Sequence, residues 1–502
     1  MHHVSLIIEF LRGRPASAFW VVALTQGVLW TLIPALFYSA PPGDVPLLLA
    51  IGREFVLGSY LGPPLAFWLG EIAFRFGGML GLYALSQICI VTALWAVFTL
   101  GRAVVGTRHA VLGILLMVGI AAFTVPSPEF GPAVLAAPLW ALALLHYWRA
   151  VGLFQRGAWF LLALDCGLLL LTSYAGVILL VLLGVFTLAT TRGRRALADI
   201  EPWLALVLFF FAIAPHAAWL YAERELVMAA FRESIVTGGR LSPGMRLGAL
   251  LLASHLGLVL LAALASGWPR QRRERAPEID RPPAESLARY YVYFFAIAPA
   301  ACALAIGFAT GTLWPIGALG SLAPLILLSG LAVIVATGDR VHLYRERLVS
   351  SSWLLLLVAP PLLAASSLAL LPWLAGRDLR IAQPAKAEAQ FLTENYQRRT
   401  GKQPTTITGD ERLVPLVAMM APDRPRVFFA WAPQRSPWIS VDDVAAQGAV
   451  LVWPAEASGQ PPATLKTQFP MMVPELPRAF SRTVQGRLPP VRLGWSVLRP
   501  PQ

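Results

Sequence analysis

Hydrophobic residues form long runs in the first three quarters of the chain, separated by short polar segments. A bilayer core about 30 Å thick needs about 20 apolar residues in a helix. Only 13% of the 502 residues are charged and 57% are hydrophobic, whereas about 25% are charged in soluble globular proteins. The pattern therefore predicts a polytopic α-helical membrane protein. Eleven spans are expected, at residues 17–38, 79–100, 110–125, 132–148, 158–173, 175–191, 202–221, 247–267, 290–311, 314–336 and 352–374.

The pattern changes after the last of these runs, and from Arg377 onward the polar content is that of a soluble domain. The segment "KAEAQFLTENYQRRTGKQPTTITGDERLVPLVAMMAPDRPRVFFA" predicts helix, strand, helix, strand, and "GAVLVW" and "VRLGWSVLRPPQ" predict two more strands. It has no nucleotide-binding glycine loop. We therefore expect a transmembrane domain over residues 1–375 and a small α/β domain over residues 376–502.

The net charge of +13 would favour nucleic acid for a soluble chain, but the arginines cluster in short loops between the predicted spans. With the N-terminus in the cytoplasm, 18 arginines fall in inside loops and 6 in outside loops. This bias is the positive-inside signature. Eleven spans then place the C-terminal domain on the outer face. The loop "GWPRQRRERAPEIDRPPAESLAR" contributes most of the bias.

One segment fits neither a span nor an ordinary loop. Residues 40–78, "APPGDVPLLLAIGREFVLGSYLGPPLAFWLGEIAFRFGG", hold five charged residues among apolar ones. Asp44 is placed to cap a helix over Val45–Gly58, and a second helix is expected to begin near Pro64. We expect two short amphipathic helices in the membrane interface on the outer face.

Charged residues are costly near the membrane, so each of them is a candidate functional residue. Asp44 and Glu129 place one carboxylate each on two outer loops, where either can take or orient a hydroxyl proton. Helix capping and turn formation are the structural alternatives. Arg53 and Arg75 suit a phosphate at the lipid–water boundary, with pairing to neighbouring glutamates or lipid headgroups as alternatives.

His216 ends a predicted span on the same face, beside aromatic residues, and either a donor-binding site or an interfacial aromatic belt explains it. The sequence shows no His, Cys or carboxylate cluster with metal-ligand spacing, so no metal or other cofactor is expected, and a metal requirement stays open. Cys89, Cys166 and Cys302 fall inside predicted spans as core residues.

An ordered set of motifs resembles a known family. "PPGD" after the first span is followed by "YLGPPLAFWL", "PSPEFGPAVLAAPLWALALLHYW", "GLLLLTSYAGVILL", "APHAAWL" and "LWPI". This order resembles the GT-C superfamily of membrane glycosyltransferases, in particular glycosyltransferase family 39. That family includes protein O-mannosyltransferases and the transferases that add aminoarabinose or galacturonic acid to lipid A and core sugars. Asp44 is followed by Val45 where many members have a second acid, and Ser173 stands where lysine is common.

The resemblance implies a transferase that uses a polyprenyl-phosphate-linked sugar and a lipid, glycan or protein acceptor. It also implies a multi-pass protein of the bacterial inner membrane that acts on the outer face, with its N-terminus in the cytoplasm and its C-terminal domain in the periplasm. Asp44 would be the general base or would orient the acceptor, with Glu129 in a supporting role. Assigning Arg53, Arg75 and His216 to the donor is our interpretation of their positions. Two alternatives stay open: a transporter or flippase for lipid-linked sugars, for which Asp165 offers a polar group inside a span, and a degenerate GT-C scaffold without activity.

Overall fold

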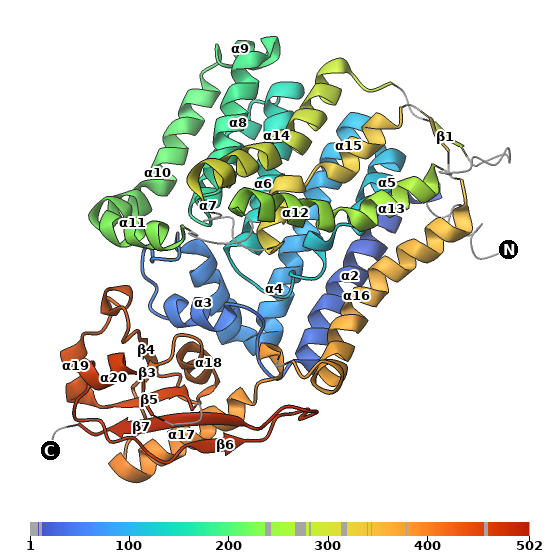
Figure 1. The fold of residues 1–502 in the computed structure, drawn as a ribbon. Helices are drawn as coiled ribbons and strands as arrows, with labels where there is room; N and C mark the ends of the chain where they lie inside the picture. Colours follow the sequence, from blue (N-terminus) through green and yellow to red (C-terminus); the bar gives the residue numbers. More distant parts are fainter. Residues whose placement is uncertain are drawn as a thin grey trace. The chain divides into compact units, whose positions relative to one another are not determined.

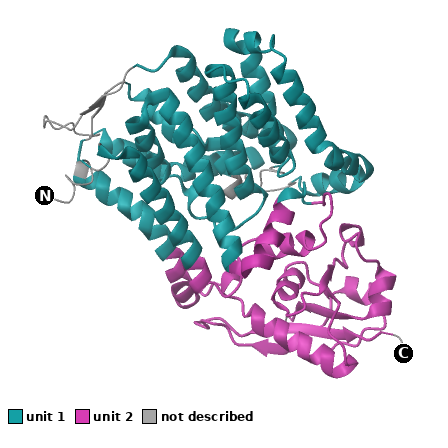
Figure 2. Ribbon diagram, turned by 180° about the vertical axis from the view of Figure 1, so that it is seen from behind, with its two compact units in different colours: residues 1–32, 61–65, 80–362 teal, residues 33–60, 66–79, 363–502 magenta. Residues whose placement is uncertain are grey.

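The structure is a computed structural model, which describes residues 9, 13–235, 242–266, 278–280, 283–312, 319–338, 340–342, 344–377, 379–455 and 460–500. The "LWPI" motif at 313–316 and the arginines at 270–275 and 281 lie outside these residues. The chain forms two compact units, coloured separately in Figure 2. Unit 1 comprises residues 1–32, 61–65 and 80–362, and unit 2 comprises residues 33–60, 66–79 and 363–502.

Helices make up almost all of unit 1 (Figure 1). They are α2 (Pro15–Phe37), α4 (Leu65–Val105), α5 (Thr107–Met117), η1 (Ala121–Phe123), α6 (Pro132–Tyr147), η2 (Trp148–Gly152), α7 (Ala158–Leu170), α8 (Gly176–Ala189), α9 (Thr191–Ala196), α10 (Glu201–Ala222), α11 (Arg224–Glu233), α12 (Pro243–Ser254), α13 (Leu256–Ala265), α14 (Ser286–Thr310), η3 (Leu319–Ile326), α15 (Ser329–Ala336) and α16 (Glu346–Leu374). The two short strands β1 (Glu278–Asp280) and β2 (Arg340–His342) pair antiparallel. The ends of α2 and α16 and the first turns of α4 belong to unit 2.

In the described residues, each predicted span coincides with an apolar helix or a pair of consecutive helices; residues 314–318 of the tenth span lie outside them. Among the described residues, seven helical segments are long and apolar enough to cross a membrane: 15–37, 65–105, 132–152, 201–222, 243–265, 286–310 and 347–374. Four further apolar helices, at 107–117, 158–170, 176–189 and 322–336, are shorter. The chain is a polytopic helical membrane protein, as the hydrophobic pattern predicts.

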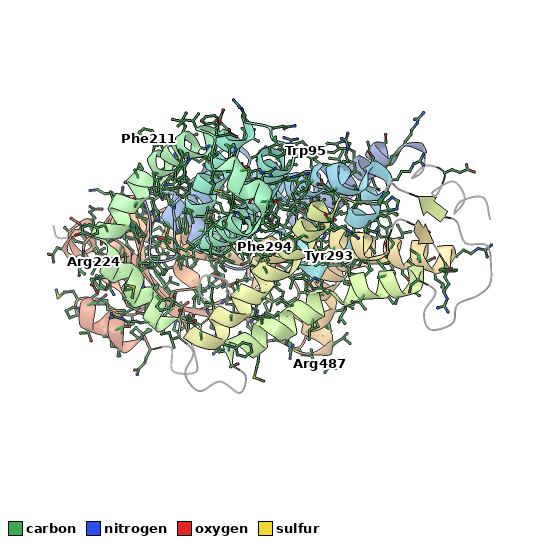
Figure 3. The ribbon with its side chains drawn as sticks, turned by 90° about the horizontal axis from the view of Figure 1, so that it is seen from above. Trp95, Phe211, Arg224, Tyr293, Phe294 and Arg487 are labelled. Carbon is green, nitrogen blue, oxygen red and sulfur yellow. The ribbon has the colours of Figure 1, made fainter. Side chains whose placement is uncertain are left out.

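The outer surface of α10 shows why this helix needs a lipid environment. Val207 is 67% exposed and Phe211 is 80% exposed. Figure 3 shows Phe211 at the outer edge of the helix. A continuous apolar surface of this kind is unfavourable in water but not in lipid. Other large side chains of unit 1 are buried, among them Trp30 and Trp140. The buried Tyr147 stacks on Tyr291 with 6.2 Å between ring centroids.

Residues 40–78 differ from the prediction in where their helices end. Helix α3 covers only Val45–Gly52, and the expected second short helix is the beginning of α4, which continues to Val105. A kink at Gly78, with φ 57° and ψ −145°, separates the two parts of α4. Glycine adopts this positive φ without a steric penalty. The predicted span over 79–100 therefore begins directly after the kink, where the chain changes direction.

The C-terminal part of unit 2 is an α/β fold, as predicted. Its elements are η4 (Arg380–Ala382), α17 (Ala385–Thr400), β3 (Thr406–Gly409), α18 (Leu413–Met420), β4 (Arg426–Phe428), η5 (Pro433–Arg435), α19 (Val441–Gln447), β5 (Ala449–Pro454), α20 (Ala463–Gln468), β6 (Arg478–Phe480) and β7 (Val491–Leu498). The strand order is β4-β3-β5-β7-β6; β3 runs parallel to β4 and β5, and β7 runs antiparallel to β5 and β6. Within unit 2, α3 packs against α18.

Candidate functional site

Asp44 occupies the N-cap position of α3, but its side chain makes no capping hydrogen bond there. Its backbone carbonyl accepts the first helical hydrogen bond, from the Leu48 N–H at 2.9 Å, and Pro46 supplies a favourable fixed φ near the helix start. The residue is exposed. The carboxylate is therefore presented at the surface of unit 2 and is not used as a helix cap.

A buried tyrosine marks the surroundings of Asp44. Burial raises the pKa of Tyr60, the nearby Arg435 guanidinium lowers it, and the carboxylates of Glu411 and Asp44 raise it further. The Arg435 guanidinium lies 4.5 Å from the centroid of the Tyr60 ring. Asp44 therefore lies close enough to Tyr60 and Arg435 to influence the protonation of the Tyr60 hydroxyl.

The second carboxylate of the segment, Glu71, is fully buried and holds two arginines. Arg75, one helical turn later, donates to it at 2.7 Å, as the four-residue spacing predicts. Arg424 donates through both terminal nitrogens, at 2.8 and 2.7 Å. Such a two-pronged contact is the strongest geometry that arginine offers a carboxylate. Arg424 also adopts φ 47°, which is uncommon for a residue other than glycine.

A third ion pair between an arginine and a glutamate lies beside Glu71 and its two arginines. Arg426 contacts Glu54 at 3.3 Å, and the Glu54 side chain is only 6% exposed. Burial raises the pKa of Glu54, while Arg426 and Arg53 lower it. Arg53 follows α3 directly, and burial lowers its pKa. Its Nη1 atom is buried and has no hydrogen-bond partner among the described residues.

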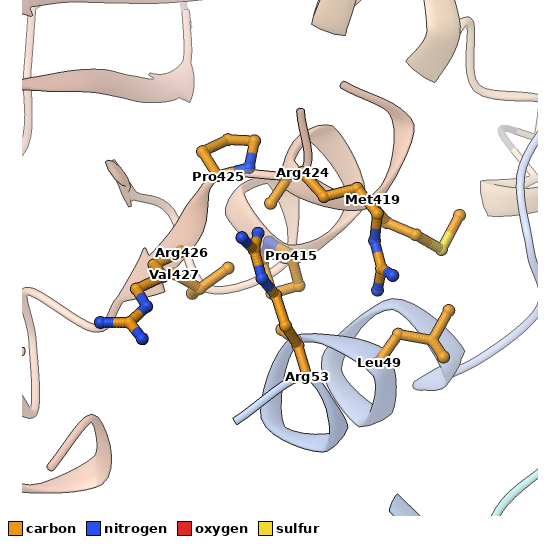
Figure 4. Close-up of a pocket in the computed structure, with 10 residues that line it drawn as sticks. Leu49, Arg53, Pro415, Met419, Arg424, Pro425, Arg426 and Val427 are labelled. Atoms are coloured by element: carbon orange, nitrogen blue, oxygen red, sulfur yellow. The ribbon is translucent and has the colours of Figure 1, made fainter. Parts of the chain in front are cut away.

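Three of these guanidinium groups line one small pocket within unit 2. Arg53 follows the end of α3, Arg424 lies between α18 and β4, and Arg426 is the first residue of β4 (Figure 4). Leu49, Met419 and other residues complete the wall of this pocket. The site thus combines cationic and apolar surface.

The other predicted residues lie in unit 1. Glu129 is half-buried in the turn before α6, where its N–H donates to the Pro126 carbonyl at 3.0 Å. His216 is buried in α10, 3.2 Å from the Tyr174 hydroxyl, and it stacks on Trp219 at 5.5 Å. Asp44, Arg53 and Arg75 therefore share unit 2, whereas Glu129 and His216 belong to unit 1.

Two features of the structure were not predicted from the sequence. Arg424 and Arg426 come from the C-terminal domain, and no sequence spacing connects them to residues near position 60. In unit 1, His146 Nδ1 and Asp165 Oδ2 form a buried pair at 2.5 Å; the sequence indicates Asp165 but not its partner. Among the residues that the structure describes, no group of three or more His, Cys, Asp or Glu could hold a metal ion.

Comparison with known proteins agrees with the resemblance. The family model described as dolichyl-phosphate-mannose-protein mannosyltransferase matches residues 62–219. This range includes Arg75, Glu129 and His216, but not Asp44 or Arg53. No curated protein matches the chain.

Two solved structures are similar over almost their whole length. The crystal structure of ArnT from Cupriavidus metallidurans bound to undecaprenyl phosphate is 16% identical, with 97% of this chain and 99% of that chain covered and a TM-score of 0.59. The apo structure of the same protein is 14% identical, with the same coverage and a TM-score of 0.58. The predicted resemblance to GT-C glycosyltransferases is confirmed, and at this identity the structural likeness establishes the fold.

Proposed function

We propose that this chain is a membrane glycosyltransferase that moves a sugar from a polyprenyl-phosphate-linked donor to a hydroxyl of a lipid, glycan or protein. We place the reaction on the outer face of the bacterial inner membrane. The observation that carries the proposal is the exposed Asp44 carboxylate at the start of α3, in a chain with the fold of ArnT. The undecaprenyl phosphate bound to that relative supports the lipid-linked donor.

In the proposed reaction, the acceptor oxygen attacks C1 of the sugar as the bond from C1 to the phosphate oxygen breaks. The hydroxyl proton passes to the Asp44 carboxylate, which acts as general base. Polyprenyl phosphate leaves with a developing negative charge that arginines stabilise. Glu129 has a supporting role in orienting the acceptor, and the apolar helices accommodate the isoprenoid chain.

Arg53, Arg75 and His216 are our proposed donor-binding residues. Their surroundings differ: Arg75 already donates to Glu71 and His216 contacts Tyr174. In contrast, the buried Nη1 atom of Arg53 has no hydrogen-bond partner within the part of the chain that the structure describes. We therefore assign the donor phosphate to Arg53 first. A flippase is the less favoured function because the Asp165 carboxylate, which would serve a polar path, is paired with His146.

The test is a deletion strain complemented with variants, with mass spectrometry of the lipids, glycans and proteins of the cell envelope. We expect a glycosylated species to disappear on deletion and to return with the wild type. Asp44→Asn should lower the transfer rate at least about 100-fold, since a general base contributes about 10²–10⁴-fold. Asp442→Asn, an exposed aspartate of the same unit, is the matched control and should restore the product fully.

A different outcome would separate the alternatives. If Asp44→Asn restored the product to the wild-type level, Asp44 would not be the base. If deletion changed no glycosylated species, the scaffold interpretation would replace the proposed enzyme.

A further inference from the structure

The C-terminal domain holds the chain on the N-terminal side of Asp44. The N–H groups of Ser39 and Ala40 both donate to the Ile381 carbonyl, at 2.9 and 3.1 Å. Ala40 is 3% exposed and belongs to one apolar cluster with Leu416 of α18. All of these residues lie in unit 2. Four residues before Asp44, the chain is therefore fixed by two hydrogen bonds and by apolar packing.

Helix α3 fixes the chain on the other side of Asp44. Its Leu49 side chain is fully buried, and the helix packs against α18, which also carries Leu416. Directly beyond α3, Glu54 contacts Arg426 at 3.3 Å. The C-terminal domain therefore holds the chain both before and after Asp44.

The turn between these two attachments has little conformational freedom of its own. The rings of Pro41 and Pro42 fix their φ angles. Gly43 has φ 54°, which glycine adopts without a steric penalty. Asp44 follows directly and is exposed. Residues on surface loops are usually mobile, whereas this carboxylate is carried by a backbone that is restrained on both sides.

We infer that the C-terminal domain positions the proposed base, and that Leu416 is a positioning residue for Asp44. A general base must lie within hydrogen-bond reach of the proton that it takes, and a displacement of about 1 Å can lower a rate about 100-fold. Leu416 packs with Ala40 before the base, and its helix supports α3 after the base. The role of the base rests on the proposed function, but the anchoring of the turn rests on the contacts within unit 2.

Hydrogen–deuterium exchange of the purified full chain in nanodiscs measures this anchoring without a substrate. Leu416→Ala leaves a cavity in the apolar cluster, so we expect the amides of residues 39–53 to exchange about tenfold faster or more. Leu465→Ala is the matched control. Leu465 is buried to a similar degree, with 2% exposure against 6% for Leu416, but the described residues of its core cluster lie between Phe428 and Leu498. This variant should leave the exchange of residues 39–53 unchanged.

Sugar transfer is measured in the complemented deletion strain, as the initial rate at which the glycosylated species returns after induction. We expect Leu416→Ala to lower this rate about tenfold or more. Leu416→Met keeps the side-chain volume and should keep most of the rate, and Leu465→Ala should keep the wild-type rate. In the Asp44→Asn chain, adding Leu416→Ala should lower the rate no further, because the base is already absent.

Circular dichroism and gel filtration show whether each variant is folded. If Leu416→Ala is not folded, Leu416→Val makes a smaller cavity at the same position and should change exchange and transfer in the same directions.

The outcomes distinguish the positioning role from the proposed base. Wild-type exchange of residues 39–53 in Leu416→Ala would overturn the anchoring, and so would an equal increase in Leu465→Ala. Faster exchange together with wild-type transfer in Leu416→Ala would overturn the positioning role. If Asp44→Asn transfers sugar normally, the proposed base fails and the positioning role fails with it, whereas the anchoring measured by exchange stands.

Discussion

Glu71 is the residue on which the charge network of unit 2 depends most. Its side chain is 0% exposed and accepts from Arg75 and Arg424. Removing one partner from a buried ion pair leaves the other charge desolvated, which costs about 3–5 kcal/mol. We therefore expect Glu71→Ala to lower the free energy of unfolding of the full chain by that amount, measured by SDS titration in mixed micelles.

Arg75→Gln is the control for this prediction. The Arg75 side chain is 54% exposed, and exposed ion pairs contribute at most about 1 kcal/mol. Arg75→Gln should therefore lower the free energy of unfolding several times less than Glu71→Ala does. Equal losses for the two variants would show that the Arg424 contact adds nothing to stability.

The same residues show what the sequence can and cannot predict at this scale. The Glu71–Arg75 pair follows from a four-residue spacing on one helix. The Arg424 contact joins residues 353 positions apart, and only the folded chain brings them together. Asp44 was correctly placed at a helix start, but sequence could not show whether its side chain caps the helix. The roles of Asp44, Glu129, Arg53, Arg75 and His216 remain predictions.

At the scale of elements, the contact between α3 and α4 depends on a glycine. A Cβ atom at Gly52 would lie 2.3 Å from the Phe67 carbonyl oxygen, closer than any real contact. Because that oxygen belongs to the backbone, the helices must shift. We expect Gly52→Ala to destabilise the chain by about 1–3 kcal/mol and to weaken polyprenyl-phosphate binding, because Arg53 follows Gly52.

Gly77→Ala is the matched substitution in α4. A Cβ atom there meets nothing within 4 Å, and alanine in a helix is favoured over glycine by about 0.5–1 kcal/mol. Gly77→Ala should therefore raise the free energy of unfolding, whereas Gly52→Ala should lower it. A stable Gly52→Ala chain with wild-type binding would contradict the close approach of α3 and α4.

Element type could be predicted where the pattern is strong, and element ends could not. In the described residues, each of the eleven apolar runs contains helix, because a helix pairs the backbone polar groups that lipid cannot hydrogen-bond. The end of α3 at Gly52 and the kink at Gly78 that separates the two parts of α4 depend on local backbone geometry that hydrophobicity does not encode. In the C-terminal domain, β6 was missed because Arg478–Phe480 is short and lies at the sheet edge.

At the scale of the whole molecule, orientation in the membrane is the property that the proposed reaction requires. The seven long and four shorter apolar helices of the described residues make eleven segments, which is the odd number that the hydrophobic pattern predicts. If all eleven segments cross the membrane, as the hydrophobic pattern predicts, the two ends of the chain lie on opposite sides of the membrane. The arginine excess on the side of the N-terminus, 18 against 6, then predicts a cytoplasmic N-terminus and a periplasmic C-terminal domain, where a water-borne acceptor has access.

Cysteine labelling with a membrane-impermeant maleimide tests this orientation in spheroplasts. Ser481→Cys lies at an exposed position of the C-terminal domain, and Gln155→Cys lies in the exposed loop before α7. The native Cys89 and Cys166 are buried and Cys302 is half-buried, so the unmodified chain gives the background. We expect Ser481→Cys to be labelled in intact spheroplasts and Gln155→Cys only after lysis, because the arginine-rich loops resist translocation. The reverse labelling would place Asp44 and the arginine pocket in the cytoplasm and would refute an outer-face transferase, whatever the activity of the purified chain.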